Sequence, residues 1–350
     1  MLQLRWNPFE HQSTYDFDDY KSQPFILDGL ETPKVLKNKL IWNVTSNQRV
    51  LIKIISTKGA GKSTLSFYLQ DSLEQLKNSN LLIFYTSKIG LEYYNLLGSF
   101  LHEFNIDTNG FKNNEEAIKH FLEDKKIYLF IDFQDILVSS YFKILANTLE
   151  KIGNLSKNIS IILTMNKVHA VKMEAYSYVL GKYTSFELPG FSLGNTNSLI
   201  KERLKTARKD NYEGDELYPF QKLTELIFNH SGGIPRNILS ACDLLLSNFE
   251  DGEIDLDLAS LLLKGEFAKK VIYDMTLEGY EREYLMQLYD VVRNDFNGEI
   301  SKEKDLTDYM EKNKGWSNKT TSKRLRKLFG FGLLNINKGE DLWSNVIRII

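Results

Sequence analysis

The sequence VLIKIISTKGAGKST, residues 50–64, decides the fold. VLIKII is a short β-branched run that is apolar except at Lys53, which is typical of a strand buried inside a parallel sheet. The loop after it ends in GAGKST, residues 59–64, and a helical pattern then runs from Lys62 to Lys77. Because a strand, a glycine-rich loop and a helix follow one another in this order, the stretch predicts a phosphate-binding loop.

The composition of this loop suits the binding of ATP or ADP. Small residues let backbone N–H groups turn inward around an anion, and the start of a helix adds partial positive charge. We expect Lys62 to reach the β- and γ-phosphates, the Ser63 hydroxyl to bind Mg²⁺, and Thr64 to contact the α-phosphate. The residues expected to hold the nucleotide here are Gly59, Ala60, Gly61, Lys62, Ser63 and Thr64.

Ser56 stands where the motif usually has its first glycine. That position needs an unusual turn more than it needs a side chain, so we expect serine to weaken the site without destroying it. The alternative interpretation is a glycine-rich turn with an incidental lysine.

Further apolar runs alternate with helical patterns along the chain. Residues 81–86, 127–133 and 159–166 predict three more buried strands, and residues 184–189 a possible fifth. Strands that alternate with helices favour an α/β fold in which helices cover both faces of a parallel sheet.

The run IYLFIDF, residues 127–133, ends in a carboxylate. On a parallel sheet the carboxyl ends of the strands line one crevice, so Asp132 is expected to face the loop and to hold Mg²⁺ together with Ser63. The alternative is an aspartate that caps a turn. Phe133 follows where many ATPases have a glutamate that activates water, and Asp135 could contribute only through a water molecule. Binding is therefore better supported than hydrolysis.

Two further residues are candidates for contacts with the phosphates. Asn166 ends the strand ISIILTMN and could orient a water or sense the γ-phosphate, although a polar residue that simply ends a strand is common. In SGGIPR, Arg236 follows Pro235 at the first turn of a helix, where the helix end is already positive. A phosphate nearby would explain that arginine, and the alternative is an exposed residue on a polar face.

The C-terminal part is rich in cations. Residues 312–327 contain seven basic residues and no acidic one. Ser317 is a suitable N-cap for a helix that runs to about Phe329, with Leu325 and Leu328 facing a core. Residues 333–337 and 343–349 then predict two wing strands.

This pattern predicts a winged helix that binds duplex DNA. A basic helix can lie in the major groove while its cations neutralise phosphates. The alternative is a winged helix used for protein contacts. The residues expected to contact DNA are Ser317, Asn318, Lys319, Thr320, Lys323, Arg324 and Lys327.

The composition favours a cytoplasmic protein. The chain has 350 residues, a single cysteine and a net charge of −2. One cysteine excludes a disulfide framework and suits a reducing compartment. No stretch reaches the roughly 18 apolar residues of a membrane helix, so we expect no membrane partner.

Four motifs, GAGKST, FID, TMN and GGIPRN, stand in an order that resembles the AAA+ ATPases. With NPFE near the N-terminus and a C-terminal winged helix, the chain looks like the archaeal origin-recognition initiator ATPases and their plasmid-encoded and archaeal-ATPase relatives. The resemblance implies that Lys62, Ser63 and Thr64 belong to the Walker A motif and Asp132 to Walker B, and that Asn166 and Arg236 are the two sensors. It also implies four parts: an N-terminal arm (1–34), a nucleotide-binding core (35–190), a helical lid (191–265) and a winged-helix domain (266–350).

The sequence departs from that family at three points. Ser56 replaces a glycine, Phe133 replaces the catalytic glutamate, and no arginine lies between Asn166 and the lid. These departures indicate slow or absent hydrolysis. The resemblance implies an ATP-dependent switch that binds duplex DNA in replication initiation or in a plasmid or mobile-element process, with self-association or a partner protein. A regulatory or signalling ATPase and a transposition-type ATPase that assembles on DNA are the alternatives.

Overall fold

A computed structural model gives the structure of the protein. It describes residues 4–10, 20, 27, 30–46, 48–76, 78–87, 92–133, 139–166, 170, 181–209, 212–248, 254–275, 279–338 and 345–349.

A five-stranded parallel sheet forms the centre of the molecule, in the order β2-β3-β4-β1-β5. The strands are β1 (Leu51–Ser56), β2 (Leu81–Thr86), β3 (Lys126–Asp132), β4 (Ile159–Asn166) and β5 (Thr184–Glu187). β3 and β4 are buried along almost their whole length, as expected for inner strands that are covered on both faces. The predicted α/β class with a parallel sheet is confirmed.

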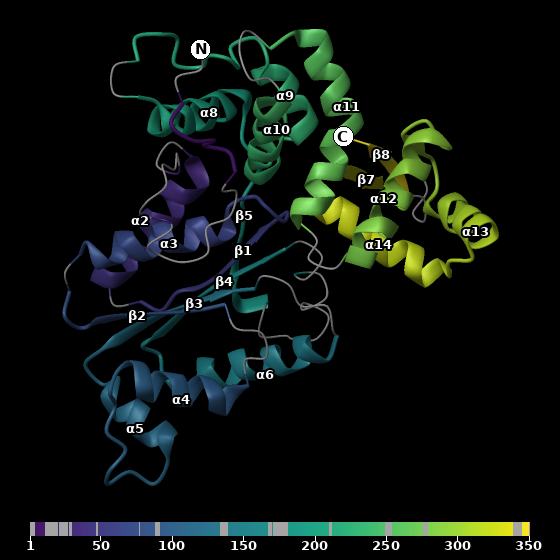
Figure 1. Cartoon of the computed structure of the whole chain (residues 1–350). Coiled ribbons are helices and arrows are strands. Elements are labelled where there is room, and N and C mark those ends of the chain that lie inside the picture. Colours follow the sequence, from purple (N-terminus) through teal and green to yellow (C-terminus); the bar gives the residue numbers. More distant parts are fainter. Residues whose placement is uncertain are drawn as a thin grey trace.

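Helices cover both faces of this sheet (Figure 1). On one face lie α2 (Glu31–Ser46) and α3 (Lys62–Glu74); on the other lie α4 (Tyr93–Glu103), α5 (Asn114–Phe121) and α6 (Ser139–Leu155). Each face has its own hydrophobic core. The sheet is thus a rigid support for the loop that follows β1.

A helical region packs beside the core. It consists of α8 (Leu193–Ala207), α9 (Thr224–Ser231), α10 (Pro235–Asn248) and α11 (Leu256–Met275). Residues 4–10 pack on this region, where Phe9 meets Phe220 edge to face at 5.4 Å and Asn7 Nδ2 donates to Asp243 Oδ1 at 2.6 Å. This part of the predicted arm therefore contacts the helical region, which is distant in sequence.

The C-terminal part has the element order of a winged helix. It contains α12 (Gly279–Asn294), β6 (Glu299–Ile300), α13 (Glu303–Lys314), α14 (Asn318–Gly330), β7 (Leu334–Lys338) and β8 (Asn345–Ile349). The three strands form an antiparallel sheet in the order β6-β8-β7. We call α12 to β8 the winged helix.

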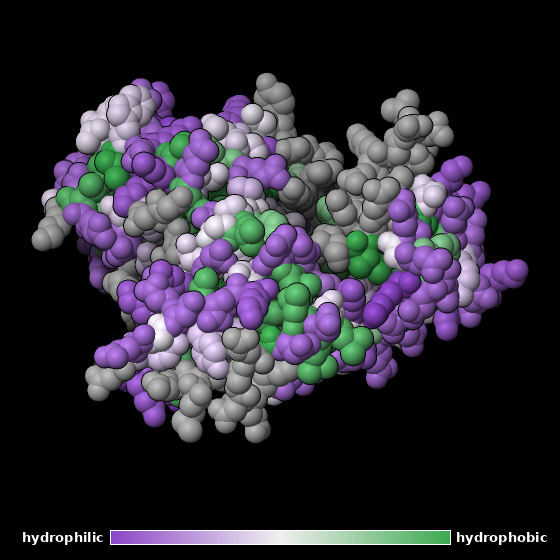
Figure 2. Space-filling model, turned by 90° about the horizontal axis from the view of Figure 1, so that it is seen from above, coloured by the Kyte–Doolittle hydropathy of each residue, from purple (hydrophilic) through white to green (hydrophobic). Residues whose placement is uncertain are grey.

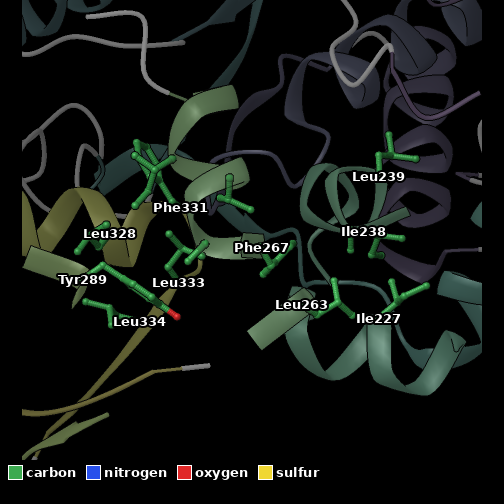
Figure 3. Close-up of a cluster of buried hydrophobic side chains, with 14 of the residues drawn as sticks. Ile227, Ile238, Leu239, Leu263, Phe267, Tyr289, Leu328, Phe331, Leu333 and Leu334 are labelled. Atoms are coloured by element: carbon green, nitrogen blue, oxygen red, sulfur yellow. The ribbon is translucent and has the colours of Figure 1, made fainter. Parts of the chain in front are cut away.

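Two of the predicted domain boundaries fall inside helices. The boundary at 34/35 lies within α2, and the boundary at 265/266 lies within α11. α11 is continuous because its buried positions Leu263, Phe267 and Val271 keep helical spacing across that point. The helical region thus extends to Met275, and a single hydrophobic cluster runs through it and the winged helix (Figure 3).

Candidate nucleotide site and basic surface

The loop between β1 and α3, residues 56–61, has the backbone that an anion cradle needs. Gly59 and Gly61 have positive φ angles of 82° and 90°, and Gly61 is the N-cap of α3. Ser56 is fully buried as the last residue of β1 and is not among the residues with positive φ. Its backbone does not require glycine, so serine fits this position without strain. We call residues 56–61 the phosphate loop.

The Lys62 ammonium lies across this loop. It donates to the carbonyl oxygen of Thr57 at 2.8 Å and to Ser56 Oγ at 3.3 Å. The side chain that replaces the usual glycine therefore contacts the lysine expected to hold the phosphates.

Asp132 is the centre of a polar cluster at the end of β3. Its side chain is 2% exposed and accepts hydrogen bonds from Ser63 Oγ at 2.5 Å, Thr164 Oγ1 at 2.5 Å and the Tyr85 hydroxyl at 3.1 Å. The structure thus brings together Ser63 and Asp132, the two residues expected to bind Mg²⁺. A hydroxyl and a carboxylate suit this ion, which usually takes its remaining ligands from phosphates and water.

Sequence reasoning gave no role to Tyr85 or to the Thr164–Asp132 contact. Thr164 lies opposite Asp132 in the β3–β4 register, and Tyr85 is on the neighbouring strand β2. Burial, and then the adjacent Asp132 charge, raises the pKa of Tyr85 well above its ordinary value, so the phenol remains a donor. The sequence could have indicated these contacts, because both residues lie near the ends of strands that are next to β3.

Asn166 and Arg236 both lie beside the phosphate loop. Asn166 ends β4 and lies opposite Ser56 in the β1–β4 register. The backbone N–H of Arg236, in the first turn of α10, donates to the carbonyl oxygen of Gly59 at 3.1 Å. The positive end of α10 therefore lies against the phosphate loop.

Solved structures share the fold of this chain. Aeropyrum pernix ORC2 in ADPNP-ADP complexes aligns with a TM-score of 0.52 and 13% identity, over 98% of this chain and 93% of that chain. Its ADP form aligns with a TM-score of 0.50 and 12% identity, over 91% of this chain and 90% of that chain. A single-residue variant of Thermotoga maritima RuvB aligns with a TM-score of 0.50 and 14% identity, over 91% of each chain. No family model and no curated protein matches the sequence.

The chain has the AAA+ fold. The sheet order, the phosphate loop after β1 and the full-length similarity to these structures agree on this. We call the helical region, α8 to α11, the lid, after the part that the sequence predicts there. At this level of identity the similarity shows the fold alone.

Phe133 is apolar where a glutamate is usual, and its side chain is also buried. Its side chain is 5% exposed and stacks on Phe142 of α6 at 6.1 Å, within the hydrophobic core of that face. Its backbone N–H donates to the carbonyl oxygen of Thr164 at 3.0 Å. This side chain thus lies in the core, under α6. Asp135, the predicted substitute for the glutamate, lies outside the described residues.

The start of α14 is as predicted, with Ser317 as N-cap. Ser317 Oγ accepts from the Thr320 backbone N–H at 3.3 Å, and Leu325 and Leu328 are fully buried. Ser317 and Asn318 are exposed in the first turn.

The cations of α14 divide into two groups. Lys327 Nζ donates to Glu281 of α12 at 2.8 Å, and Arg324 lies 3.7 Å from the same carboxylate. The Arg324 guanidinium also lies against the rings of Tyr284 and Trp316, at 3.9 and 4.2 Å from their centroids. These two cations, which are predicted to contact DNA, connect α14 to α12.

The second group is exposed. Lys319, Lys323 and Arg326 follow one another at intervals of four and three residues, so they share one side of α14. Arg326 belongs to the basic run of residues 312–327 but is not among the residues predicted to contact DNA. We call these three residues the exposed basic face.

Proposed function

We propose that this protein binds ATP and ADP with Mg²⁺ in the phosphate loop and uses the nucleotide as a conformational switch for a DNA-binding winged helix. The contact between Ser63 and the buried Asp132, directly beside the loop, is the observation that carries the nucleotide proposal. Mg²⁺ would neutralise phosphate charge there. Lys62 would turn to the β- and γ-phosphates, and Gly59, Ala60, Gly61 and Thr64 would surround them.

Asn166 and Arg236 are proposed to contact the γ-phosphate and so to sense its presence. Asn166 belongs to the sheet and Arg236 to the lid, so a phosphate between them would fix the angle of the lid against the core. Because Phe133 places an apolar ring in the core instead of a carboxylate near the phosphates, we propose slow or absent hydrolysis. A slow reaction suits a switch.

We propose that the winged helix binds duplex DNA through the exposed basic face, with Ser317, Asn318 and Thr320 at the helix start contacting phosphates or base edges. Lys312 and Lys314, at the end of α13, are exposed and add positive charge nearby. The edge of the molecule formed by the winged helix is mainly hydrophilic, on the right in Figure 2. Cations clustered on one side of an exposed helix are the electrostatic signature of nucleic-acid binding.

The setting that fits these properties is replication initiation or a plasmid or mobile-element process in the cytoplasm. The fold shared with A. pernix ORC2 and the winged helix support this part of the proposal. Among the described residues no helix is long and apolar enough to cross a membrane.

The test is duplex-DNA binding by fluorescence anisotropy with ATP, ADP or no nucleotide across a salt series. The variant is Lys319→Glu/Lys323→Glu/Arg326→Glu. Its matched control is Lys112→Glu/Lys119→Glu/Lys157→Glu. It reverses the charge of three exposed lysines on the surface of the nucleotide-binding part, with the same change in net charge. Lys62→Ala tests the nucleotide loop.

We expect the wild type and the core control to bind DNA with a steep salt dependence. Each lost phosphate contact lowers that slope by about 0.9. The variant of the exposed basic face should lose most of its affinity, and Lys62→Ala should remove the effect of ATP. Equal weakening by both triple variants would show that only net charge matters. Absence of DNA binding in the wild type would favour a regulatory ATPase, and ATP-dependent oligomers on any sequence would favour a transposition-type ATPase.

A further inference from the structure

The C-terminal end of α14 lies against the phosphate loop. The last carbonyl groups of a helix have no partner within the helix and must find one elsewhere. In α14 the carbonyl oxygens of Lys327, Leu328 and Phe329 accept from N–H groups of the chain that follows the helix, at 2.9 to 3.1 Å. The carbonyl oxygen of Gly330 instead accepts the backbone N–H of Lys58, in the phosphate loop, at 3.1 Å.

Two further contacts surround this hydrogen bond. The Lys58 ammonium lies 5.4 Å from the centre of the Phe331 ring. Asn237, next to Arg236 in the lid helix α10, is fully buried and donates from Nδ2 to the carbonyl oxygen of Phe331 at 3.0 Å. Phosphate loop, lid and winged helix therefore meet at residues that are adjacent in each part: 58–59, 236–237 and 330–331.

The charges at this junction favour competition with a nucleotide. The C-terminal end of a helix carries partial negative charge, so α14 presents a negative dipole end to a loop whose N–H groups suit an anion. Phosphates bound in the same loop would add negative charge beside Gly330. The carbonyl end of α14 and a nucleotide would therefore compete for the same loop.

The lid and the winged helix would respond together. Figure 3 shows side chains of the lid, among them Ile238 and Leu263, continuing through Phe267 and Phe331 to Leu328 of the winged helix. The contacts of Arg324 and Lys327 with Glu281 fix α14 to the rest of the winged helix. A close-packed interior moves as a unit, so loss of the Lys58–Gly330 contact would free both parts to pivot together on the core.

We infer that the end of α14 is an internal competitor of the nucleotide: ATP displaces Gly330 from Lys58, and the lid and winged helix then turn together to a second position on the core, which the contact of Arg236 with the γ-phosphate fixes. This inference rests on the proposed binding of ATP to the phosphate loop. It goes further in assigning Gly330–Gly332 as the element that transmits the occupancy of the loop to the helix bearing the exposed basic face.

Gly332 offers a local way to break the contact. Its φ is +72°, and a Cβ at this position would lie 2.0 Å from Cδ1 of Ile234 in the lid, closer than two carbon atoms that are not bonded can approach. Gly332→Ala should therefore force the end of α14 and Ile234 apart and weaken the neighbouring Lys58–Gly330 contact. Gly315→Ala is the matched control, because Gly315 has φ +67° and open space around its Cβ position. The double variant Ile234→Ala/Gly332→Ala removes the clash and should restore the contact.

The first measurement is the Kd of MgATP by isothermal titration calorimetry in all four proteins. Removing a competing contact worth one hydrogen bond should tighten ATP binding about fivefold in Gly332→Ala. Gly315→Ala should match the wild type, and the double variant should return toward it. An unchanged or weaker affinity in Gly332→Ala would overturn the inference.

The second measurement is the distance between spin labels at Lys112→Cys in the core and Lys319→Cys in α14. In the wild type the distance distribution should change when MgATP is added. In Gly332→Ala without nucleotide, the distance distribution should already resemble that of the wild type with MgATP. If ATP binds but the distribution stays the same, only the inference fails; if no protein binds ATP, the proposed function fails with it.

Discussion

Replacing Glu281 by glutamine tests whether two cations of α14 serve the structure instead of DNA binding. The change removes one negative charge and keeps the size of the side chain. The Glu281 side chain is 10% exposed, and its partners Arg324 and Lys327 are 12% and 23% exposed. An exposed ion pair contributes about 0.5 kcal/mol, whereas removing one partner of a buried pair costs about 4 kcal/mol. For this partly buried cluster we expect a loss of about 2 kcal/mol in the free energy of unfolding.

The assay is urea unfolding followed by circular dichroism. Glu283→Gln, an exposed glutamate on the same helix, is the control and should change stability by less than about 0.5 kcal/mol. A double-mutant cycle of Glu281→Gln with Lys327→Met isolates the ion pair and should give a coupling energy of about 1 kcal/mol. Coupling within about 0.3 kcal/mol of zero would refute the reasoning and return Lys327 to the DNA-binding candidates.

Two other predictions concern buried side chains. Phe133→Glu would place a carboxylate against Phe142 in the core, so we expect a loss of about 3 kcal/mol in stability and no gain in phosphate release, with Phe133→Leu as the milder control. A folded Phe133→Glu protein that hydrolyses ATP faster would contradict this. Cys242 is fully buried, and burial, reinforced by the adjacent Asp243, raises the pKa of its thiol. Labelling of Cys242 by a thiol reagent at pH 8 should therefore follow the unfolding of the lid, and labelling at the rate of a free thiol would show that the lid opens in the native protein.

Much of the core could be predicted because its signals are local. The apolar runs that became β1 to β4, and the glycines that take positive φ in the phosphate loop, act through near neighbours in the chain. Parallel strands carry their C-terminal residues to one edge, which is enough to bring Ser63 and Asp132 together. The N-cap Ser317 and the buried Leu325 and Leu328 followed from helical spacing in the same way.

The sequence predicts less well which way the side chains on those elements point. The spacing of the basic residues in α14 gave several that share a side, but it did not say which side faces α12. The answer depends on Glu281, which is 43 residues away from Arg324 in the sequence. Phe133 is similar: its identity indicated a missing glutamate, while its position in the core depends on contact with Phe142.

The sequence by itself determined the parallel sheet, the phosphate loop and the presence of a basic C-terminal helix, because patterns of polarity and backbone preference act over a few residues. Only the tertiary structure decided that residues 4–10 contact the lid, that Arg324 and Lys327 turn inward, and that Gly330 meets Lys58. Each of these pairs segments that are distant in the chain. Such contacts form where packing leaves a buried charge or a helix-end carbonyl in need of a partner, and no local pattern records which partner that is.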